Sequence, residues 1–75
     1  MTGPVLEQWT VYYSPADAPG RYVARRFYIA GGSVTPTSLA FSAATLDGVR
    51  MAIPQGLVRV PRAPSDPAPI VETWT

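Results

Sequence analysis

The 75-residue sequence contains no cysteine, no histidine, no lysine and no asparagine. Without cysteine there can be no disulfide bond and no cysteine nucleophile. Without histidine and lysine there is no Cys/His zinc site, no imidazole general base and no Schiff-base lysine. These absences remove the side chains of much covalent and metal-dependent catalysis. The sequence therefore predicts a protein that is not an enzyme, with no catalytic residues, no bound metal and no cofactor.

Charge is also scarce. Six arginines stand against five acidic residues, and charged residues make up 15% of the chain, compared with about 25% in typical soluble domains. A net charge of +1 is not the basic footprint of a nucleic-acid-binding protein. The longest uncharged stretch, 27–46, is interrupted by glycines and a proline, so it predicts no membrane-spanning helix. We expect a cytoplasmic protein without membrane contact.

The length predicts one small domain, residues 1–75. At about 25 cal/mol per Å², burial of apolar surface would contribute about 110 kcal/mol. Ordering the chain at about 1.5 kcal/mol per residue costs about the same. Because no disulfide bond adds to this balance, the remaining stability must come from good packing, from prolines that restrict the unfolded chain, or from a partner.

Several segments have the composition of β-strands. Trp9–Tyr13 and Tyr22–Ala30 are dense in aromatic and β-branched residues, and the connection 14–20 contains two prolines and a glycine. We expect these two strands to pair with each other. Ile70–Trp74 is predicted to be the last strand, and Leu57–Val60 is a shorter candidate.

Other segments are less regular. Residues 34–42 contain Pro36, which argues against a central strand and leaves open an edge strand or a packed loop. Residues 1–6 are expected to be a frayed lead. Residues 61–69 hold four prolines and predict an extended, polyproline-like arm within the domain.

One short helix is predicted over residues 46–53. Thr45 is a good N-cap, and Leu46, Val49 and Ile53 form one apolar stripe before a proline ends the helix. Such a short helix must pack on a sheet. The predicted fold class is α+β, a small antiparallel sheet of three to four strands with one short helix on one face. An all-β sheet with a helical turn is the alternative.

In this fold one face of the sheet is covered by the helix and the other is open. Trp9, Tyr13 and Phe27 suit the covered face. Three tyrosines and an arginine would then lie together on the open face. This candidate interaction face consists of Tyr12, Tyr22, Arg26 and Tyr28. The composition suits a protein interface, base stacking or simple cross-strand stabilisation, and the sequence does not decide between them.

The remaining charged residues are expected to be solvated. Arg25 and Arg26 are adjacent and would point to opposite faces of a strand. We expect the arginines to pair at the surface with Glu7, Glu72 or Asp66.

Five strings in the sequence, taken together, resemble a group of short bacterial proteins of unknown function. They lie at 9–12, 14–19, 22–26, 54–62 and 70–74 and read WTVY, SPADAP, YVARR, PQGLVRVPR and IVETW. The group is common in GC-rich proteobacteria and is sometimes found near mobile elements. The resemblance implies no activity, so no site residue can be transferred from it.

The sequence therefore predicts a small interaction module that binds another protein or itself, with a homodimer as one form. The resemblance extends this to an inhibitor of a host factor, encoded by a mobile element or a phage. The alternative is an accessory protein that binds nucleic acid, which the low net charge makes the weaker prediction.

Overall fold

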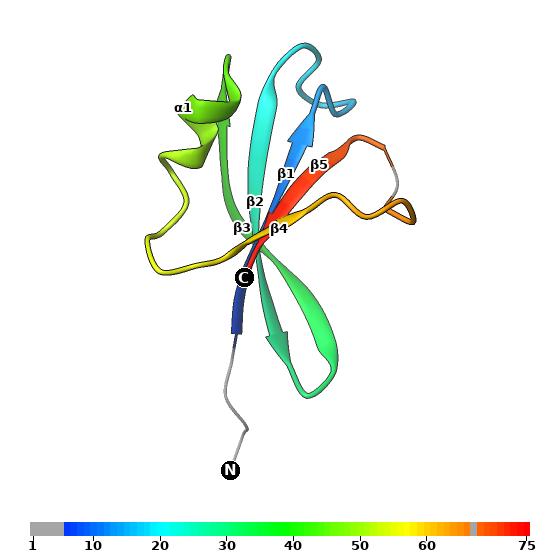
Figure 1. Ribbon diagram of the computed structural model, residues 1–75, viewed down its shortest axis with the longest axis vertical. Helices are drawn as coiled ribbons and strands as arrows, with labels where there is room; N and C mark the ends of the chain where they lie inside the picture. Colours follow the sequence, from blue (N-terminus) through cyan, green and yellow to red (C-terminus); the bar gives the residue numbers. More distant parts are fainter. Residues whose placement is uncertain (1–5, 67) are drawn as a thin grey trace.

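A computed structural model of the protein describes residues 6–66 and 68–75 (Figure 1). Its elements, in chain order, are β1 (Leu6–Tyr13), β2 (Tyr22–Ala30), β3 (Ser33–Ala43), α1 (Leu46–Arg50), β4 (Arg59–Pro61) and β5 (Ile70–Trp74). The strands form one antiparallel sheet in the order β3-β2-β1-β5-β4. The α+β class is confirmed, but the sheet has five strands rather than the three to four predicted.

The additional strands form because prolines are tolerated at sheet edges. Pro36 lies within β3, at one edge of the sheet, and Pro61 lies within β4, at the other. Gly31 (φ 58°) and Gly32 (φ 79°) make the tight turn between β2 and β3. Both positive φ angles suit a two-residue hairpin turn and favour glycine. The segment 34–42 is thus an edge strand, one of the two readings that the sequence left open.

The proline-rich segment is not an extended arm. Asp66 N donates to Ala63 O (3.0 Å), and Ala63 N donates to the Asp66 carboxylate (2.9 Å), so the chain turns there. Arg62 bridges the loop by donating to the carbonyls of Asp66 (2.7 Å) and Ile70 (3.1 Å). The predicted extended arm over 61–69 is therefore wrong, because hydrogen bonds of Arg62 and Asp66 fold this segment into a loop. Pro67 lies outside the described residues.

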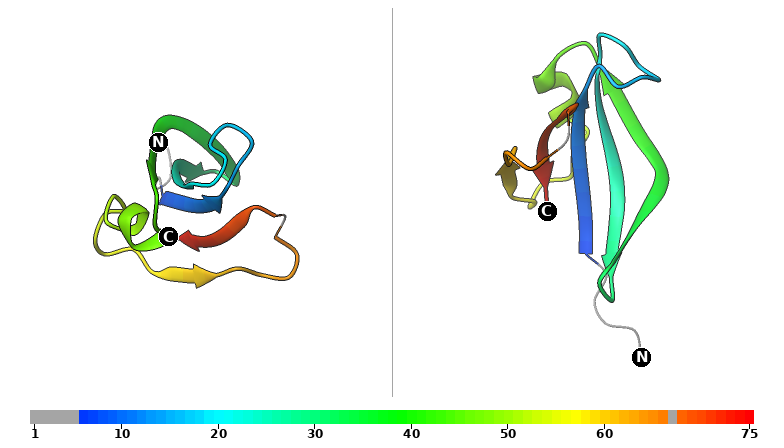
Figure 2. Two further views of the ribbon diagram at one scale, coloured as in Figure 1. Left: turned by 90° about the horizontal axis from the view of Figure 1, so that it is seen from above. Right: turned by 90° about the vertical axis from the view of Figure 1, so that its right-hand side faces the viewer.

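At the N-terminus, Leu6 belongs to β1 and is paired with Ile29, so it is not part of a frayed lead. Residues 1–5 of the predicted lead lie outside the described residues. The side view in Figure 2 shows β1, β2 and β3 as three long strands side by side, with the helix and the shorter β4 and β5 to one side of them. The turn between β2 and β3 projects from one end of the molecule.

The helix forms where it is predicted but is shorter. Thr45 Oγ1 accepts a hydrogen bond from Gly48 N (3.0 Å), which confirms Thr45 as the N-cap. Regular helix ends at Arg50, and two overlapping turns, with hydrogen bonds from Ala52 N to Val49 O (3.2 Å) and from Ile53 N to Arg50 O (3.1 Å), bring Ile53 into the core. The core cluster consists of Trp9, Val11, Ala24, Val49 and Ile53. The predicted apolar stripe therefore packs on the sheet, with Leu46 at its margin.

The first prediction concerns this packing. Ile53→Ala removes a buried side chain from a small core and is expected to lower the free energy of unfolding by about 2–5 kcal/mol. Met51→Ala is the matched control, because Met51 is 88% exposed and a surface change of this kind shifts stability by only about 0.5 kcal/mol. Urea or thermal unfolding measures both variants. Equal stabilities would contradict the placement of the segment that follows α1.

Candidate interaction surface

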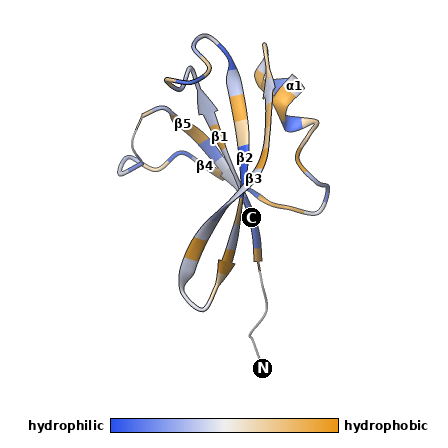
Figure 3. Cartoon of the chain, turned by 180° about the vertical axis from the view of Figure 1, so that it is seen from behind, coloured by the Kyte–Doolittle hydropathy of each residue, from blue (hydrophilic) through white to orange (hydrophobic). Residues whose placement is uncertain are grey.

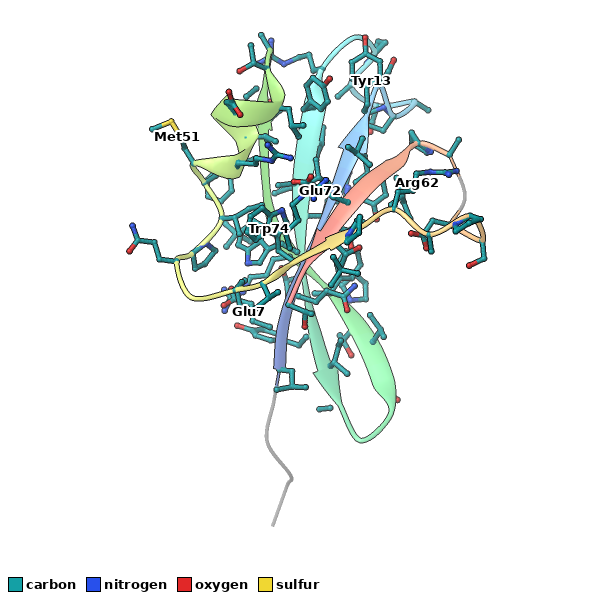
Figure 4. All side chains as sticks on the ribbon, viewed as in Figure 1. Glu7, Tyr13, Met51, Arg62, Glu72 and Trp74 are labelled. Atoms are coloured by element: carbon teal, nitrogen blue, oxygen red, sulfur yellow. The ribbon has the colours of Figure 1, made fainter. Side chains whose placement is uncertain are left out.

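We call the face of the sheet on which α1 packs the helix-side face. A fully buried carboxylate, Glu72 of β5, lies at its centre (Figure 4). Arg50 of α1 binds it with two hydrogen bonds, from Nε to Oε2 (2.9 Å) and from Nη2 to Oε1 (2.7 Å). Arg59 of β4 donates from Nε to Oε1 (2.9 Å). Trp74 Nε1 donates to Oε2 (2.8 Å). The carboxylate thus joins α1, β4 and β5, and we call these four residues the Glu72 clamp.

The clamp keeps Glu72 ionised. The hydrogen bonds from Arg50 are the largest cause, and with those from Arg59 and Trp74 they hold the pKa of the Glu72 carboxyl at about 2, against an ordinary value of 4.5. Burial acts in the opposite direction and is overcome. The expectation that Glu72 is a solvated surface charge is therefore wrong, although its predicted pairing with arginine is confirmed.

A second carboxylate on the same face repeats part of this arrangement. Trp9 Nε1 donates to Glu7 Oε2 (2.9 Å), just as Trp74 does to Glu72. Arg26 Nε lies 2.8 Å from the same Glu7 oxygen. Trp9 and Trp74 are paired across β1 and β5. Each tryptophan of the chain thus follows by two residues the glutamate that it binds, a spacing that was visible in the sequence and could have revealed both clusters.

The four residues of the predicted interaction face do not lie together. The register pairs Glu7 with Tyr28, Trp9 with Arg26 and Tyr13 with Tyr22, which places Tyr22, Arg26 and Tyr28 on the helix-side face. There the Arg26 guanidinium lies 4.6 Å from the centre of the Tyr28 ring, and the rings of Tyr13 and Tyr22 are 4.8 Å apart. Tyr12 is paired with Val23 and lies on the opposite face.

The predicted register between β1 and β2 was wrong by one residue, so the side chains of β2 were assigned to the wrong faces of the sheet. Sequence reasoning placed odd-numbered residues of both strands on one face, whereas the register pairs odd residues of β1 with even residues of β2. Phe27 is consequently paired with Gln8 on the open face, not on the covered face as expected. Trp9 and Tyr13 do lie on the helix-side face.

The open face is the face of the sheet opposite α1, and β2 turns its more apolar side toward it. Val23, Phe27 and Ile29 lie there, whereas Arg26 lies on the covered side. Arg25 is the one charged residue of β2 on this face, and it pairs with Asp17 (2.6 Å).

Apolar residues gather on the open face near the turn between β2 and β3. Leu6, Ile29 and Val34 are opposite one another on β1, β2 and β3, and Phe27 is opposite Pro36. We call these five residues the hairpin patch. Leu6 is 55% exposed and Val34 57% exposed. Figure 3 shows hydrophobic positions on both strands of the hairpin near its turn. The patch contains no charged residue.

Most of the arginines are already engaged. Arg25, Arg26, Arg50 and Arg59 form ion pairs with carboxylates, and Arg62 binds backbone carbonyls. Five of the six arginines are thus held by partners within the chain. The described residues contain no metal-binding group of acidic side chains and enclose no pocket. Among them, no helix is long and apolar enough to cross a membrane.

Comparison with protein-family models, with curated proteins and with solved structures found no match to this chain. The resemblance to short bacterial proteins therefore stays a prediction from the five sequence strings.

The second prediction concerns the clamp. Glu72→Gln leaves Arg50 with only the exposed Asp47, 3.6 Å away, and Arg59 without its countercharge. Removing one member of a fully buried ion pair costs about 3–5 kcal/mol, but these arginine side chains are 31% and 49% exposed, so we expect a loss of about 2–3 kcal/mol. Asp17→Asn is the control, because the Arg25 and Asp17 side chains are 42% and 63% exposed and such surface pairs contribute about 0–1 kcal/mol. Denaturant unfolding measures both, and equal losses would argue against a special role for Glu72.

The third prediction concerns pH. Because the folded-state pKa of Glu72 is depressed to about 2 from an ordinary 4.5, the stability that its charge provides is present above pH 4.5 and is lost as the pH falls toward 2. The advantage of the wild-type protein over Glu72→Gln should therefore be full at neutral pH and decline steadily across this acid range. Unfolding of both proteins, measured at several pH values, gives the difference directly. A difference independent of pH would show that packing, not charge, accounts for the loss.

Proposed function

We propose that this protein is a non-enzymatic interaction module that binds another protein through the open face of its sheet. The observation that carries the proposal is the hairpin patch, in which apolar side chains from three neighbouring strands lie side by side, away from α1. Contiguous exposed apolar surface on a small protein is characteristic of an interaction site.

The distribution of polarity between the two faces supports the proposal. In an ordinary two-layer fold the apolar face of a strand is buried and the polar face is solvated. Here β2 places Arg26 on the covered side, and Phe27 and Ile29 on the open side. A sequence that departs from the folding pattern in this way does so most often at a functional site. The open face is thus built as if a further layer were to cover it.

The chemistry of the patch defines the partner. Because none of its five residues is charged, it favours an apolar, uncharged surface on a second protein over an acidic or basic one. Gln8 lies beside Phe27 at the margin of the patch, and the Arg25–Asp17 pair lies farther along the face, so these polar groups would form a rim. If the resemblance to proteins near mobile elements holds, the partner is a host factor and binding inhibits it.

Binding of nucleic acid is the weaker alternative. Phosphate contacts need free lysine or arginine side chains, and most of the arginines of this chain are held by internal partners. Tyr22, Arg26 and Tyr28 have the composition of a base-stacking site, but Arg26 is paired with Glu7 and lies against Tyr28.

The fourth prediction tests the hairpin patch. The tagged wild-type chain is used to capture partners from the source cell, and the double variant Leu6→Asp, Val34→Asp is compared with it. Both side chains are more than half exposed, so the fold should be retained. We expect specific partners to be lost, because each aspartate would be buried unpaired in an apolar interface.

The matched control is Met51→Asp, Val58→Asp, which places the same charges at two exposed apolar positions, 88% and 67% exposed, outside the patch. It should capture the same partners as the wild type. Undiminished capture by the Leu6, Val34 variant would refute the use of this face. A mobility shift that weakens steeply between about 50 and 200 mM salt would support nucleic acid instead.

A further inference from the structure

The two edges of the sheet differ in how they are protected against pairing with another chain. β4 has only three residues, and they include Arg59 and Pro61. Short length, charge and proline are devices by which proteins block an exposed edge. β3 has eleven residues and no charged residue among them. It is a long, neutral edge.

The first half of β3 carries a blocking device within the strand, and α1 packs beside Ala43 at the far end of the second half. Pro36 has no N–H to offer a further strand, and after it the register shifts opposite Arg26. Within this irregular stretch Thr37 Oγ1 donates to Arg26 O (3.0 Å) and accepts from Leu39 N (3.2 Å). Beyond it, from Ala40 to Ala43, β3 follows β2 in regular register.

The outward-facing groups of this second half can be assigned from the register. Ser14 N donates to Arg21 O (2.7 Å), so Arg21 and alternate residues after it face β1. Ala24 therefore faces β3, and its partner Phe41 faces back toward β2. The neighbours of Phe41 on either side, Ala40 and Ser42, turn their N–H and C=O groups away from the sheet. Both residues are exposed.

We propose that a second copy of this chain pairs with this edge, β3 against β3, around a two-fold axis that passes beside Phe41. In this register Ala40 of each copy exchanges reciprocal backbone hydrogen bonds with Ser42 of the other. The two Phe41 residues face each other across the axis as a non-hydrogen-bonded pair, the closer kind in antiparallel sheets. The product is one continuous ten-stranded sheet, twice the five strands of each copy.

The chemistry of β3 favours a copy of itself as the occupant. A two-fold axis sets a strand against its own sequence, so that charged residues near the axis would often meet like charges, which destabilise cross-strand pairs. β3 contains none. Its exposed apolar residues near the axis are Leu39 and Phe41, at 38% and 42%. Phe41 already stacks on Trp9, with ring centres 5.8 Å apart, and pairing would extend this stack into the second copy.

The fifth prediction uses the absence of cysteine from the sequence. Phe41→Cys introduces a single thiol at the proposed axis, where the two Cα atoms would be about 4.5 Å apart, within the range of about 4.4–6.8 Å that disulfides span. Mild oxidation should convert most of this variant to a covalent dimer. Val58→Cys is the control: its position is 67% exposed and directly precedes β4, at the opposite edge of the sheet, so it should stay largely monomeric under the same conditions.

A pair of charge variants tests the same register without cysteine. Ala40→Glu, Ser42→Glu sets like charges opposite each other and should abolish the dimer in sedimentation at micromolar concentration. Ala40→Arg, Ser42→Glu sets opposite charges against each other and should retain it. Circular dichroism verifies that each variant is folded. A monomeric wild type, or equal behaviour of the two charge variants, would overturn the proposal. The Leu6, Val34 variant should remain dimeric, so failure of the patch and failure of the edge can be told apart.

Discussion

The position of every short element in this protein depends on the buried charge of Glu72. α1 has five residues and β4 has three, and elements of this length have no stability of their own. Arg50 from the helix and Arg59 from β4 converge on one carboxylate of β5. An unpaired carboxylate at this depth would be severely destabilising, so burial of Glu72 requires that an arginine lie beside it. The clamp thereby fixes the geometry of the helix side more than it adds free energy.

Placing the clamp on the helix side has a consequence for the other face. Glu7, Arg26 and Glu72 occupy helix-side positions that apolar residues would fill in an ordinary two-layer fold. Val23, Phe27 and Ile29 of β2 then fall on the open side, where Val23 is buried and the other two are partly exposed. The charged residues on the helix-side face and the hairpin patch on the open face thus both follow from the register between β1 and β2.

Local sequence signals predicted the helix and strands well, but not the register between strands or the face on which each side chain lies. The strands Tyr22–Ala30 and Ile70–Trp74 were predicted with the bounds observed, and so was the N-cap Thr45, because each depends on neighbouring residues. The face predicted for Tyr12 was right, but the faces predicted for Phe27 and Tyr28 were wrong. They depend on the register between β1 and β2, and a shift of one residue reverses every side chain of a strand. The Glu72–Trp74 contact spans two residues and was visible in the sequence. The arginine partners of Glu72 come from 22 and 13 residues away, a separation that no local pattern encodes.

Dimerisation through the β3 edge would affect how the hairpin patch binds a partner. Residues paired across antiparallel strands point to the same side of a sheet, so pairing of β3 with a second β3 would place both copies of α1 on one side and both open faces on the other. The two hairpin patches would then form part of one surface of doubled width. A partner with two matching sites, or a symmetric partner, would bind both patches with the second contact made intramolecular. Weak apolar contacts on a patch of five residues could in this way combine into stable binding without any further contact from either copy.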